Sequence, residues 1–502
     1  MFRKVLVANR GEIAVRVVRA LREMNIASVA IFSEADRRAL HVQMADEAVP
    51  VGPAASSESY LSIPRILDAA QITGAEAIHP GYGFLSENAQ FASACEQARI
   101  KFIGPSSQTI EQMGSKTSAR RVAIAAGAPV VPGTEQGIRD YEEARRTAAA
   151  IGYPVLLKAA AGGGGKGMRR VDRESELESA MRGASSEAER AFGSGEVYLE
   201  KLVERPRHIE IQVLGDEHGH LIHLGERECS IQRRHQKVVE ESPSPLVLKH
   251  PELRDRIGEA AVRIARAANY TNAGTLEFLA DQQGNFYFLE MNTRLQVEHP
   301  VTEWVTGLDL VRWQIRIAAG ERLTLAQNDI EWRGSALECR VYAEDPLNNF
   351  FPSPGVITQY AEPAGPGVRV DGGAYAGWTV PIEYDPLLAK LTAWADSREA
   401  AIDRMRRALA EFHVSGITTN LGLFARLLED ENFRAGELHT GLLDEFMRTF
   451  AEGSGHSDNH NEAVLAAVLT ATSTGQKKSH AAHTENGSTS RWRSEARQGL
   501  FR

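Results

Sequence analysis

The chain reads Thr275-Leu-Glu277-Phe-Leu-Ala-Asp-Gln-Gln-Gly284-Asn-Phe-Tyr-Phe-Leu-Glu290 across its most informative stretch. Two runs rich in aromatic and aliphatic residues flank a Gln-Gly turn, a pattern that is typical of a β-hairpin. A hairpin folded about this turn sets Glu277 opposite Glu290, because the two glutamates lie seven and six residues from Gly284.

Two carboxylates that face each other across paired strands repel unless a cation lies between them. Mg²⁺ typically takes one or two protein carboxylates together with substrate phosphates. The alternative is a pair of solvated glutamates on an outer face, but the flanking Phe278, Phe286 and Phe288 argue against full exposure. The hairpin therefore favours a magnesium site at Glu277 and Glu290.

A line of polar residues follows the hairpin. A continuing strand of period two would place on one face Glu290, Asn292, Arg294, Gln296 and Glu298. A guanidinium can hold a small oxyanion through two hydrogen bonds, and a nearby carboxylate can act as a base. A half-buried strand with a solvated face would show the same alternation, so it is the composition that points to chemistry.

A glycine-rich segment lies between two expected strands at 153–160 and 168–171, and its residues 162–167 read Gly-Gly-Gly-Gly-Lys-Gly. Bare glycine N–H groups can approach phosphate oxygens closely, and Lys158 on the preceding strand could add a point charge. The lysine of the run is not followed by Ser or Thr, so this is no P-loop. The segment predicts a phosphate-covering flap, with a mobile hairpin that binds nothing as the alternative.

Two further basic segments are less specific. Gln232-Arg-Arg-His235-Gln-Lys237 could hold phosphate or bicarbonate, or it could be an exposed strand. Leu337-Glu-Cys-Arg340 is ordinary by itself. The histidines at 218, 220 and 223 match neither H-E-x-x-H nor zinc-finger spacing, so no structural metal site is expected there.

The first ~110 residues alternate between expected strands and helices, which predicts a parallel sheet covered by helices. Only Gly11 follows the first strand, so the dinucleotide-binding fingerprint is absent. A small α/β unit over about 135–203 and a mixed region over about 204–447 are expected to follow. The expected strands are 4–8, 27–32, 75–78, 101–103, 197–202, 209–214, 274–280, 285–291 and 337–343, and the expected helices are 12–24, 91–98, 116–126, 252–268 and 398–412.

Composition excludes several classes of protein. The 502 residues carry a net charge of −9, which makes sequence-independent nucleic-acid binding a poor fit. No window approaches ~18 consecutive apolar residues, so no membrane span is expected. The three cysteines are far apart and imply no disulfide framework, which fits a reducing compartment. A strand that begins almost at residue 1, without a signal sequence, favours a cytoplasmic location.

Taken together, these segments resemble biotin carboxylase, the ATP-grasp component of biotin-dependent carboxylases, over roughly residues 1–447. The resemblance implies an α/β, ATP-grasp fold with an N-terminal Rossmann-like (pre-ATP-grasp) domain, a small flap domain and a C-terminal mixed α+β domain. The domains expected are 1–114, 115–203 and 204–447, followed by a flexible tail at 448–502. The motifs that carry the resemblance are 5–14, 79–88, Lys158 with 162–167, 232–237 and 290–303.

The resemblance also implies a role for each site residue. The phosphates of ATP would contact Lys116, Lys158, Gly164 and Gly165, and the adenine and ribose would contact Glu200, Lys201 and His208. The metal, Mg²⁺ or Mn²⁺, would bind Glu277, Glu290 and Asn292. Bicarbonate would contact Lys237, Arg294, Gln296 and Val297, with Gln232 and His235 on the neighbouring basic segment and Glu298 as its base. Biotin would meet Arg340, which stabilises its enolate, and lie near Tyr82 and Phe84.

The implied partners are a biotin carboxyl carrier protein, a second copy of the chain in a homodimer, and a carboxyltransferase subunit. No methionine is followed by lysine, so the biotinylated lysine is expected on a separate carrier. The Asn292-Thr-Arg294 and His299-Pro300 context looks more like acyl-CoA carboxylases than pyruvate carboxylases. An apolar run at 463–469 and the Arg491-Trp-Arg493 segment predict that the tail docks on a partner, unless it is the remnant of a lost fusion.

Two other classes of protein remain open at this level. Another ATP-grasp ligase would keep Lys158, Glu277 and Glu290 but would have no need of Arg340 or Glu298 in their present contexts. A non-catalytic assembly subunit could lose Glu298, Arg294 or Lys237, and all three are present. Bicarbonate-dependent ATP hydrolysis, measured with and without free biotin, separates the three interpretations.

Overall fold

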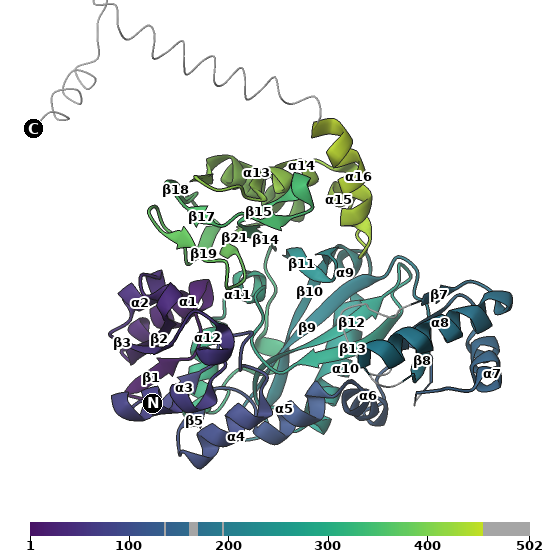
Figure 1. The fold of residues 1–502 in the computed structure, drawn as a ribbon, viewed down its shortest axis with the longest axis horizontal. Coiled ribbons are helices and arrows are strands. Elements are labelled where there is room, and N and C mark those ends of the chain that lie inside the picture. Colours follow the sequence, from purple (N-terminus) through teal and green to yellow (C-terminus); the bar gives the residue numbers. More distant parts are fainter. Residues whose placement is uncertain (135–136, 160–168, 193–194, 455–502) are drawn as a thin grey trace, which may run out of the picture. The chain divides into compact units, whose positions relative to one another are not determined.

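Figure 1 shows the chain as a computed structural model, which describes residues 1–134, 137–159, 169–192 and 195–454. Residues Met1–Phe446 form one compact unit, and the described residues 447–454 belong to a second. The predictions for Gly164, Gly165 and the tail from residue 455 onward lie outside the described residues. The division into 1–114, 115–203 and 204–447 stays a prediction.

The first sheet is parallel and has the strand order β3-β2-β1-β4-β5. Its strands are β1 (Lys4–Val7), β2 (Ala27–Ser33), β3 (Glu47–Gly52), β4 (Ala77–His79) and β5 (Lys101–Phe102). The central strands are buried, as a parallel sheet with helices on its faces requires, and Figure 1 shows α1 (Gly11–Glu23), α2 (Leu40–Met44) and α3 (Ile63–Thr73) grouped around it. The predicted strand–helix alternation is confirmed. Sequence analysis missed β3, an edge strand that contains Pro50.

The second sheet has eight strands in the order β13-β12-β9-β10-β11-β14-β21-β19, and all its pairings are antiparallel. Helix α10 (Glu252–Ala267) packs its apolar face against this sheet, and it shares a core with the strand residues Ile209, Ile211 and Phe278. The strands are β9 (Arg207–Gly215), β10 (Leu221–Arg233), β11 (Gln236–Ser242), β12 (Asn272–Ala280), β13 (Phe286–Asn292), β14 (Ser335–Tyr342), β19 (Val368–Gly372) and β21 (Leu387–Ala395).

A third, three-stranded sheet has the order β7-β6-β8. It consists of β6 (Val155–Ala159), β7 (Arg169–Val171) and β8 (Val197–Lys201), and its core includes residues of α7 (Tyr141–Ile151) and α8 (Glu174–Phe192). The two strands predicted to flank the glycine run are therefore confirmed.

The remaining elements connect or cover these sheets. In the part of the chain that the structure describes, no helix is both long and apolar enough to cross a membrane. The other helices are α4 (Ala89–Gln97), α5 (Ser107–Gly114), α6 (Lys116–Ala125), α9 (Pro245–Lys249), α11 (His299–Thr306), α12 (Leu310–Ala318), α13 (Arg398–Glu411), α14 (Leu421–Leu427), α15 (Glu431–Ala435) and α16 (Leu442–Ser454). The short 3₁₀ helices are Glu34–Asp36, Ser56–Glu58, Gln327–Asp329 and Pro346–Asn348, and the short strands are β15 (Glu344–Asp345), β16 (Phe351–Pro352), β17 (Gly355–Val356), β18 (Gln359–Ala361), β20 (Thr379–Val380) and β22 (His413–Ser415).

The hairpin prediction is confirmed, because β12 and β13 pair with Glu277 opposite Glu290. Strand β13 lies at the edge of its sheet, where the N–H of Phe288 donates to the carbonyl of Pro129 at 2.8 Å and Val130 forms a parallel bridge with Phe288.

The predicted continuation of this strand as far as Glu298 is wrong, because β13 ends at Asn292. The next N–H, that of Thr293, donates to Oε1 of Glu87 at 2.9 Å, so the backbone turns toward the first sheet. Helix α11 then begins at His299, with Pro300 in its first turn. The residues between the strand and the helix therefore form a turn-rich segment, not one face of a strand.

A buried ion pair behind the first sheet yields a test of stability. The Asp36 carboxylate accepts hydrogen bonds from Nε of Arg10 at 2.6 Å, from Nη2 of Arg10 at 2.9 Å and from the Tyr60 hydroxyl at 2.7 Å. Asp36→Ala should lower the free energy of unfolding by about 3–5 kcal/mol, because Arg10 keeps a buried charge without a partner. Chemical denaturation of the variant measures this loss.

Tyr60→Phe is the matched control, because it removes the hydrogen bond to Asp36 and the weaker one from the Ser33 N–H at 3.3 Å but leaves the ion pair intact. Its expected cost is about 1–2 kcal/mol. Equal losses of unfolding free energy in the two variants would show that the Arg10–Asp36 ion pair contributes no more than the Tyr60 hydroxyl.

Candidate active site

The centre of the site is the ammonium group of Lys237 on β11, whose side chain is 11% exposed. Its Nζ donates to Oε2 of Glu210 at 2.5 Å, to Oε1 of Glu277 at 2.8 Å and to Oε1 of Glu298 at 2.7 Å. Burial opposes the charge, but the three carboxylates outweigh it and hold the pKa of Lys237 well above its ordinary value. Lys237 is therefore a fixed cation surrounded by carboxylates from two strands and a turn.

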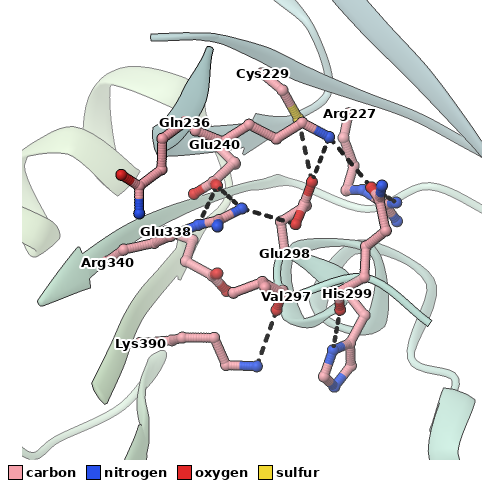
Figure 2. A network of polar contacts seen from close by, with 12 residues as sticks. Arg227, Cys229, Gln236, Glu240, Val297, Glu298, His299, Glu338, Arg340 and Lys390 are labelled. Atoms are coloured by element: carbon pink, nitrogen blue, oxygen red, sulfur yellow. Dashed lines mark hydrogen bonds and ion pairs between the residues drawn. The ribbon is translucent and has the colours of Figure 1, made fainter. Parts of the chain in front are cut away.

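Glu298 lies between two cations. Its Oε1 accepts from Lys237, and its Oε2 accepts from Nη2 of Arg340 at 2.8 Å. Figure 2 shows this carboxylate beside Arg340, with Glu240 contacting the same guanidinium. Burial raises the pKa of Glu298, but Lys237, Arg340 and Arg227 together lower it by more, so the net shift is downward. Glu298 is thus held ionised, in the form that can accept a proton.

The neighbouring Glu240 behaves differently. It is fully buried on β11 and accepts from Nε of Arg340 at 2.6 Å. Burial raises its pKa to about 7 even though Arg340 lowers it, and the negative charge of Glu298 adds to the rise. The Arg340 guanidinium therefore pairs with two carboxylates, one with a raised pKa and one with a lowered pKa.

The turn that carries Glu298 is held through its backbone as well. The carbonyl of Val297 accepts from Nζ of Lys390 at 2.9 Å, and the carbonyl of Gln296 lies 2.9 Å from Nδ1 of His299. The Gln296 side chain donates from Nε2 to Glu277 at 3.1 Å and accepts from Lys237 at 3.3 Å. The predicted residues Gln296, Val297 and Glu298 are thus brought to the Lys237 cluster, although by a turn and not by a strand.

Arg294 points toward the first sheet instead. Its Nε donates to Oε2 of Glu87 at 2.8 Å, and its Nη2 donates to Oδ1 of Asn292 at 3.1 Å. Asn292 in turn donates from Nδ2 to Oε1 of Glu277 at 2.9 Å. Asn292 therefore links Arg294 to the Lys237 cluster, and the two residues do not share a strand face with Glu298 as predicted.

The paired glutamates of the hairpin have different surroundings. Glu277 is buried, and its Oε2 lies 3.1 Å from Nε2 of His208; burial raises its pKa, but Lys237 and His208 together hold it well below the ordinary value. Glu290 is partly exposed, lies 3.8 Å from Nζ of Lys116, and has a pKa raised by burial and by the charge of Glu277. A divalent cation between them would relieve this repulsion. The residues present therefore fit a magnesium ion.

The predicted nucleotide residues lie on the small sheet and the neighbouring strands. Lys158 on β6 and Glu200 on β8 form an ion pair of 2.5 Å, while Nζ of Lys201 donates to the carbonyls of Gly152 and Tyr153 at 2.9 and 3.0 Å. His208 lies with the buried carboxylates of the main sheet.

Four further predicted residues lie outside the Lys237 cluster. Gln232 faces Lys237 across β10 and β11 and donates to the carbonyl of Cys229 at 2.8 Å, and His235 occupies the turn between these strands with a φ of 69°. The Tyr82 ring centroid lies 5.8 Å from Nζ of Lys390, and Phe84 stacks on Tyr60 at 5.0 Å.

Sequence analysis missed four buried members of the site: Glu210, Arg227, Glu240 and Lys390. Arg227 on β10 contacts Glu210, and it donates to Gln212 at 2.8 Å and to Thr302 at 2.9 Å. The available signal for Glu210 is the alternation of His208, Glu210 and Gln212 along β9, which places three polar side chains on one face of the strand.

Comparison with known proteins agrees with this architecture. Three family models match: "Biotin carboxylase, N-terminal domain" at residues 1–110, "Carbamoyl-phosphate synthase L chain, ATP binding domain" at 115–326, and "Biotin carboxylase C-terminal domain" at 338–445.

Several relatives and solved structures match over nearly their whole length. Biotin carboxylase 1 of Bacillus subtilis is 53% identical over 447 residues, covering 89% of this chain and 99% of the relative. The crystal structure of the biotin carboxylase component of a pyruvate carboxylase superposes with a TM-score of 0.81 at 52% identity, covering 90% and 99%. The crystal structure of the Hydrogenobacter thermophilus 2-oxoglutarate carboxylase biotin carboxylase domain dimer, with MgADP, ADP and bicarbonate, also has a TM-score of 0.81 at 52% identity, covering 89% and 98%.

Fold and site together define an enzyme of the ATP-grasp class. The extent and identity of the matches go one step further: this chain belongs to the biotin carboxylase family.

The Lys237 cluster makes a prediction about pH. Lys237→Met should lower the melting temperature more at pH 8 than at pH 5.5. Without the ammonium group, the folded-state pKa of the buried carboxylates rises above the unfolded value. Stability is then lost as pH rises through that window, because the folded protein retains protons that the unfolded chain releases. Thermal melting at both pH values measures the difference.

Lys101→Met is the matched control, because Lys101 and its partner Glu217 are each 39% exposed. Exposed ion pairs contribute only about 0–1 kcal/mol, so its melting temperature should barely change at either pH. A destabilisation of Lys237→Met that is the same at both pH values would contradict the proposed charge balance.

Proposed function

We propose that this chain carboxylates biotin with bicarbonate and MgATP through carboxyphosphate, the first half-reaction of a biotin-dependent carboxylase. One observation carries the proposal: a buried, ionised Glu298 is held between the side chains of Lys237 and Arg340. This arrangement supplies a base together with two cations that can bind an oxyanion. It occurs in a chain that shares 53% identity with a biotin carboxylase over 89% of its length.

Bicarbonate would bind beside Lys237, with Arg294, Gln296 and the backbone of Val297 as further contacts. The low pKa of Glu298 keeps it ionised before the anion arrives. The negative charge of the bound anion then raises that pKa, so the carboxylate becomes a better proton acceptor. Glu298 takes the bicarbonate proton, and the freed oxygen attacks the γ-phosphorus of ATP as ADP departs.

Phosphoryl transfer needs positioning and charge neutralisation more than covalent catalysis. We assign the metal to Glu277, Glu290 and Asn292; when bound, Mg²⁺ neutralises charge on the phosphate oxygens. Lys116 and Lys158 would supply point charges, with Gly164 and Gly165 covering the phosphates. For Lys158 this means exchanging its ion pair with Glu200 for a phosphate. Contacts of Glu200, Lys201 and His208 with the nucleoside stay predictions.

Carboxyphosphate would transfer its carboxyl group to the ureido N1′ of biotin, while its phosphate departs and takes up the N1′ proton. We assign to Arg340 the stabilisation of the negative charge that develops on the biotin enolate. Arg340 is buried and already oriented by Glu240 and Glu298. Such a fixed cation stabilises charge without reorganising at the moment of reaction. Tyr82 and Phe84 are assigned to the surroundings of the biotin ring, and Gln232 and His235 to the neighbouring anion-binding turn.

The proposed partners are a biotin carboxyl carrier protein and a carboxyltransferase subunit, and we propose a homodimer in the cytoplasm. The dimer is supported by the Hydrogenobacter domain, which is described as one. The acyl-CoA acceptor stays a prediction, because structures named for pyruvate and 2-oxoglutarate carboxylation are about as similar as the biotin carboxylases.

Glu298→Gln tests the assigned base. Bicarbonate-dependent ATP cleavage should fall by about 10²–10⁴ in kcat, the usual cost of losing a general base, while the Kd for MgATP stays near that of the unaltered protein. Steady-state ATPase assays and equilibrium nucleotide binding provide the two measurements. Glu217→Gln, at the surface, is the control and should keep full activity. Unchanged turnover of Glu298→Gln would refute the proposed function.

Arg340→Ala tests the assignment to biotin. Because a cation near the ureido oxygen helps only once charge develops there, carboxylation of free biotin should fall much more than biotin-independent ATP hydrolysis. Parallel assays of the two reactions give the ratio. Equal losses would show that Arg340 acts on ATP chemistry or on Glu298 alone.

A further inference from the structure

A second cation lies next to Arg340 without any part in the proposed chemistry. Lys390 on β21 is paired directly with Arg340 on β14, so the two side chains leave the same face of the sheet. Lys390 is completely buried, whereas lysine is almost never fully buried unless it is paired. Its position therefore calls for a physical reason.

The partners of Lys390 come from three separate parts of the sequence. Its Nζ donates to the carbonyl of Val297 at 2.9 Å, lies 3.3 Å from Oε2 of Glu12 at the start of α1, and lies 3.9 Å from Oδ2 of Asp371 on β19. Glu12, Val297 and Lys390 belong to the regions matched by three different family models. One ammonium group thus ties these three regions together behind the Glu298 turn.

Two paired cations hold two successive residues. Arg340 binds the side chain of Glu298, while Lys390 binds the backbone carbonyl of the residue before it. Figure 2 shows the two contacts reaching the same turn. The peptide between Val297 and Glu298 is therefore fixed on one side by Lys390, which restricts the directions that the Glu298 side chain can take.

We propose that Lys390 is a positioning residue that sets the orientation of Glu298 through the Val297 carbonyl. This inference rests on the proposed role of Glu298. Lys390 itself contacts neither Glu298 nor the Lys237 cluster in any of the hydrogen bonds and ion pairs that the structure shows for it. A displacement of about 1 Å in a reacting group can cost roughly 10²-fold in rate, so loss of this one hydrogen bond is expected to act on kcat.

Lys390→Met is the test variant, because it keeps the length and the apolar stem but removes the hydrogen bond and the charge. Bicarbonate-dependent ATP hydrolysis should lose about 10- to 100-fold in kcat, and the KM for ATP should stay within about twofold. A kcat within about threefold of the unaltered enzyme would overturn the proposal.

Glu12 separates positioning from ion-pair stability. Glu12→Gln removes the charge partner but leaves the Lys390–Val297 bond, so its kcat should be close to that of the unaltered enzyme. The double variant Lys390→Met/Glu12→Gln removes both charges, so its melting temperature should recover relative to Lys390→Met while its kcat stays low. Recovery of kcat in the double variant would show a purely structural role and overturn the proposal.

Glu298→Gln, assayed in parallel, distinguishes the two levels of inference. If Glu298→Gln is fully active, the proposed function itself fails. If Glu298→Gln is inactive and Lys390→Met is active, only the positioning role fails.

Discussion

The rest of the site depends on one buried ammonium group, that of Lys237, which donates hydrogen bonds to three carboxylates at once. Glu210, Glu277 and Glu298 come from β9, from β12 and from the turn before α11, and this contact joins them; Arg227 and Arg340 supply further positive charge to Glu210 and Glu298. The strand order β12-β9-β10-β11 is what allows a side chain from β11 to reach carboxylates two and three strands away. The order of the strands in the sheet therefore determines which charges meet in the active site.

The buried cations also determine which glutamates of the site are ionised. Burial raises the pKa of Glu240 to about 7 and that of Glu338 well above its ordinary value, whereas Glu298 and Glu277 are held ionised by nearby cations. The number of cations that each acid contacts decides the direction of its shift: Glu298 contacts both Lys237 and Arg340, whereas Glu240 contacts Arg340 alone in the ion pairs that the structure shows. A site that must admit two anionic substrates benefits from this, because excess negative charge would oppose their entry.

Local sequence patterns correctly predicted the features that depend on residues close together in the sequence. The Gly284 turn placed Glu277 opposite Glu290, and the strand–helix alternation predicted the parallel sheet. The end of β13 could not be predicted in this way, because the Thr293 N–H is captured by Glu87, 206 residues away. Glu210 and Arg227 were missed for a related reason: their pairing is visible only once two strands are adjacent. Arg340 received its role from the family resemblance, since its own segment is ordinary, whereas Glu298 already belonged to a polar line that indicated an oxyanion site with a carboxylate base.

The edge of the large sheet has a consequence for self-association. An unprotected edge strand offers its backbone to strands of other molecules and so promotes aggregation. Here the Phe288 N–H of β13 is already taken by Pro129, and the strand stops at Asn292, where the chain bends away. Growth of the sheet by addition of a foreign strand is thereby obstructed at this edge. A molecule that binds at this edge would then be recognised through side chains, whose chemistry can be selective in a way that a bare backbone ladder is not.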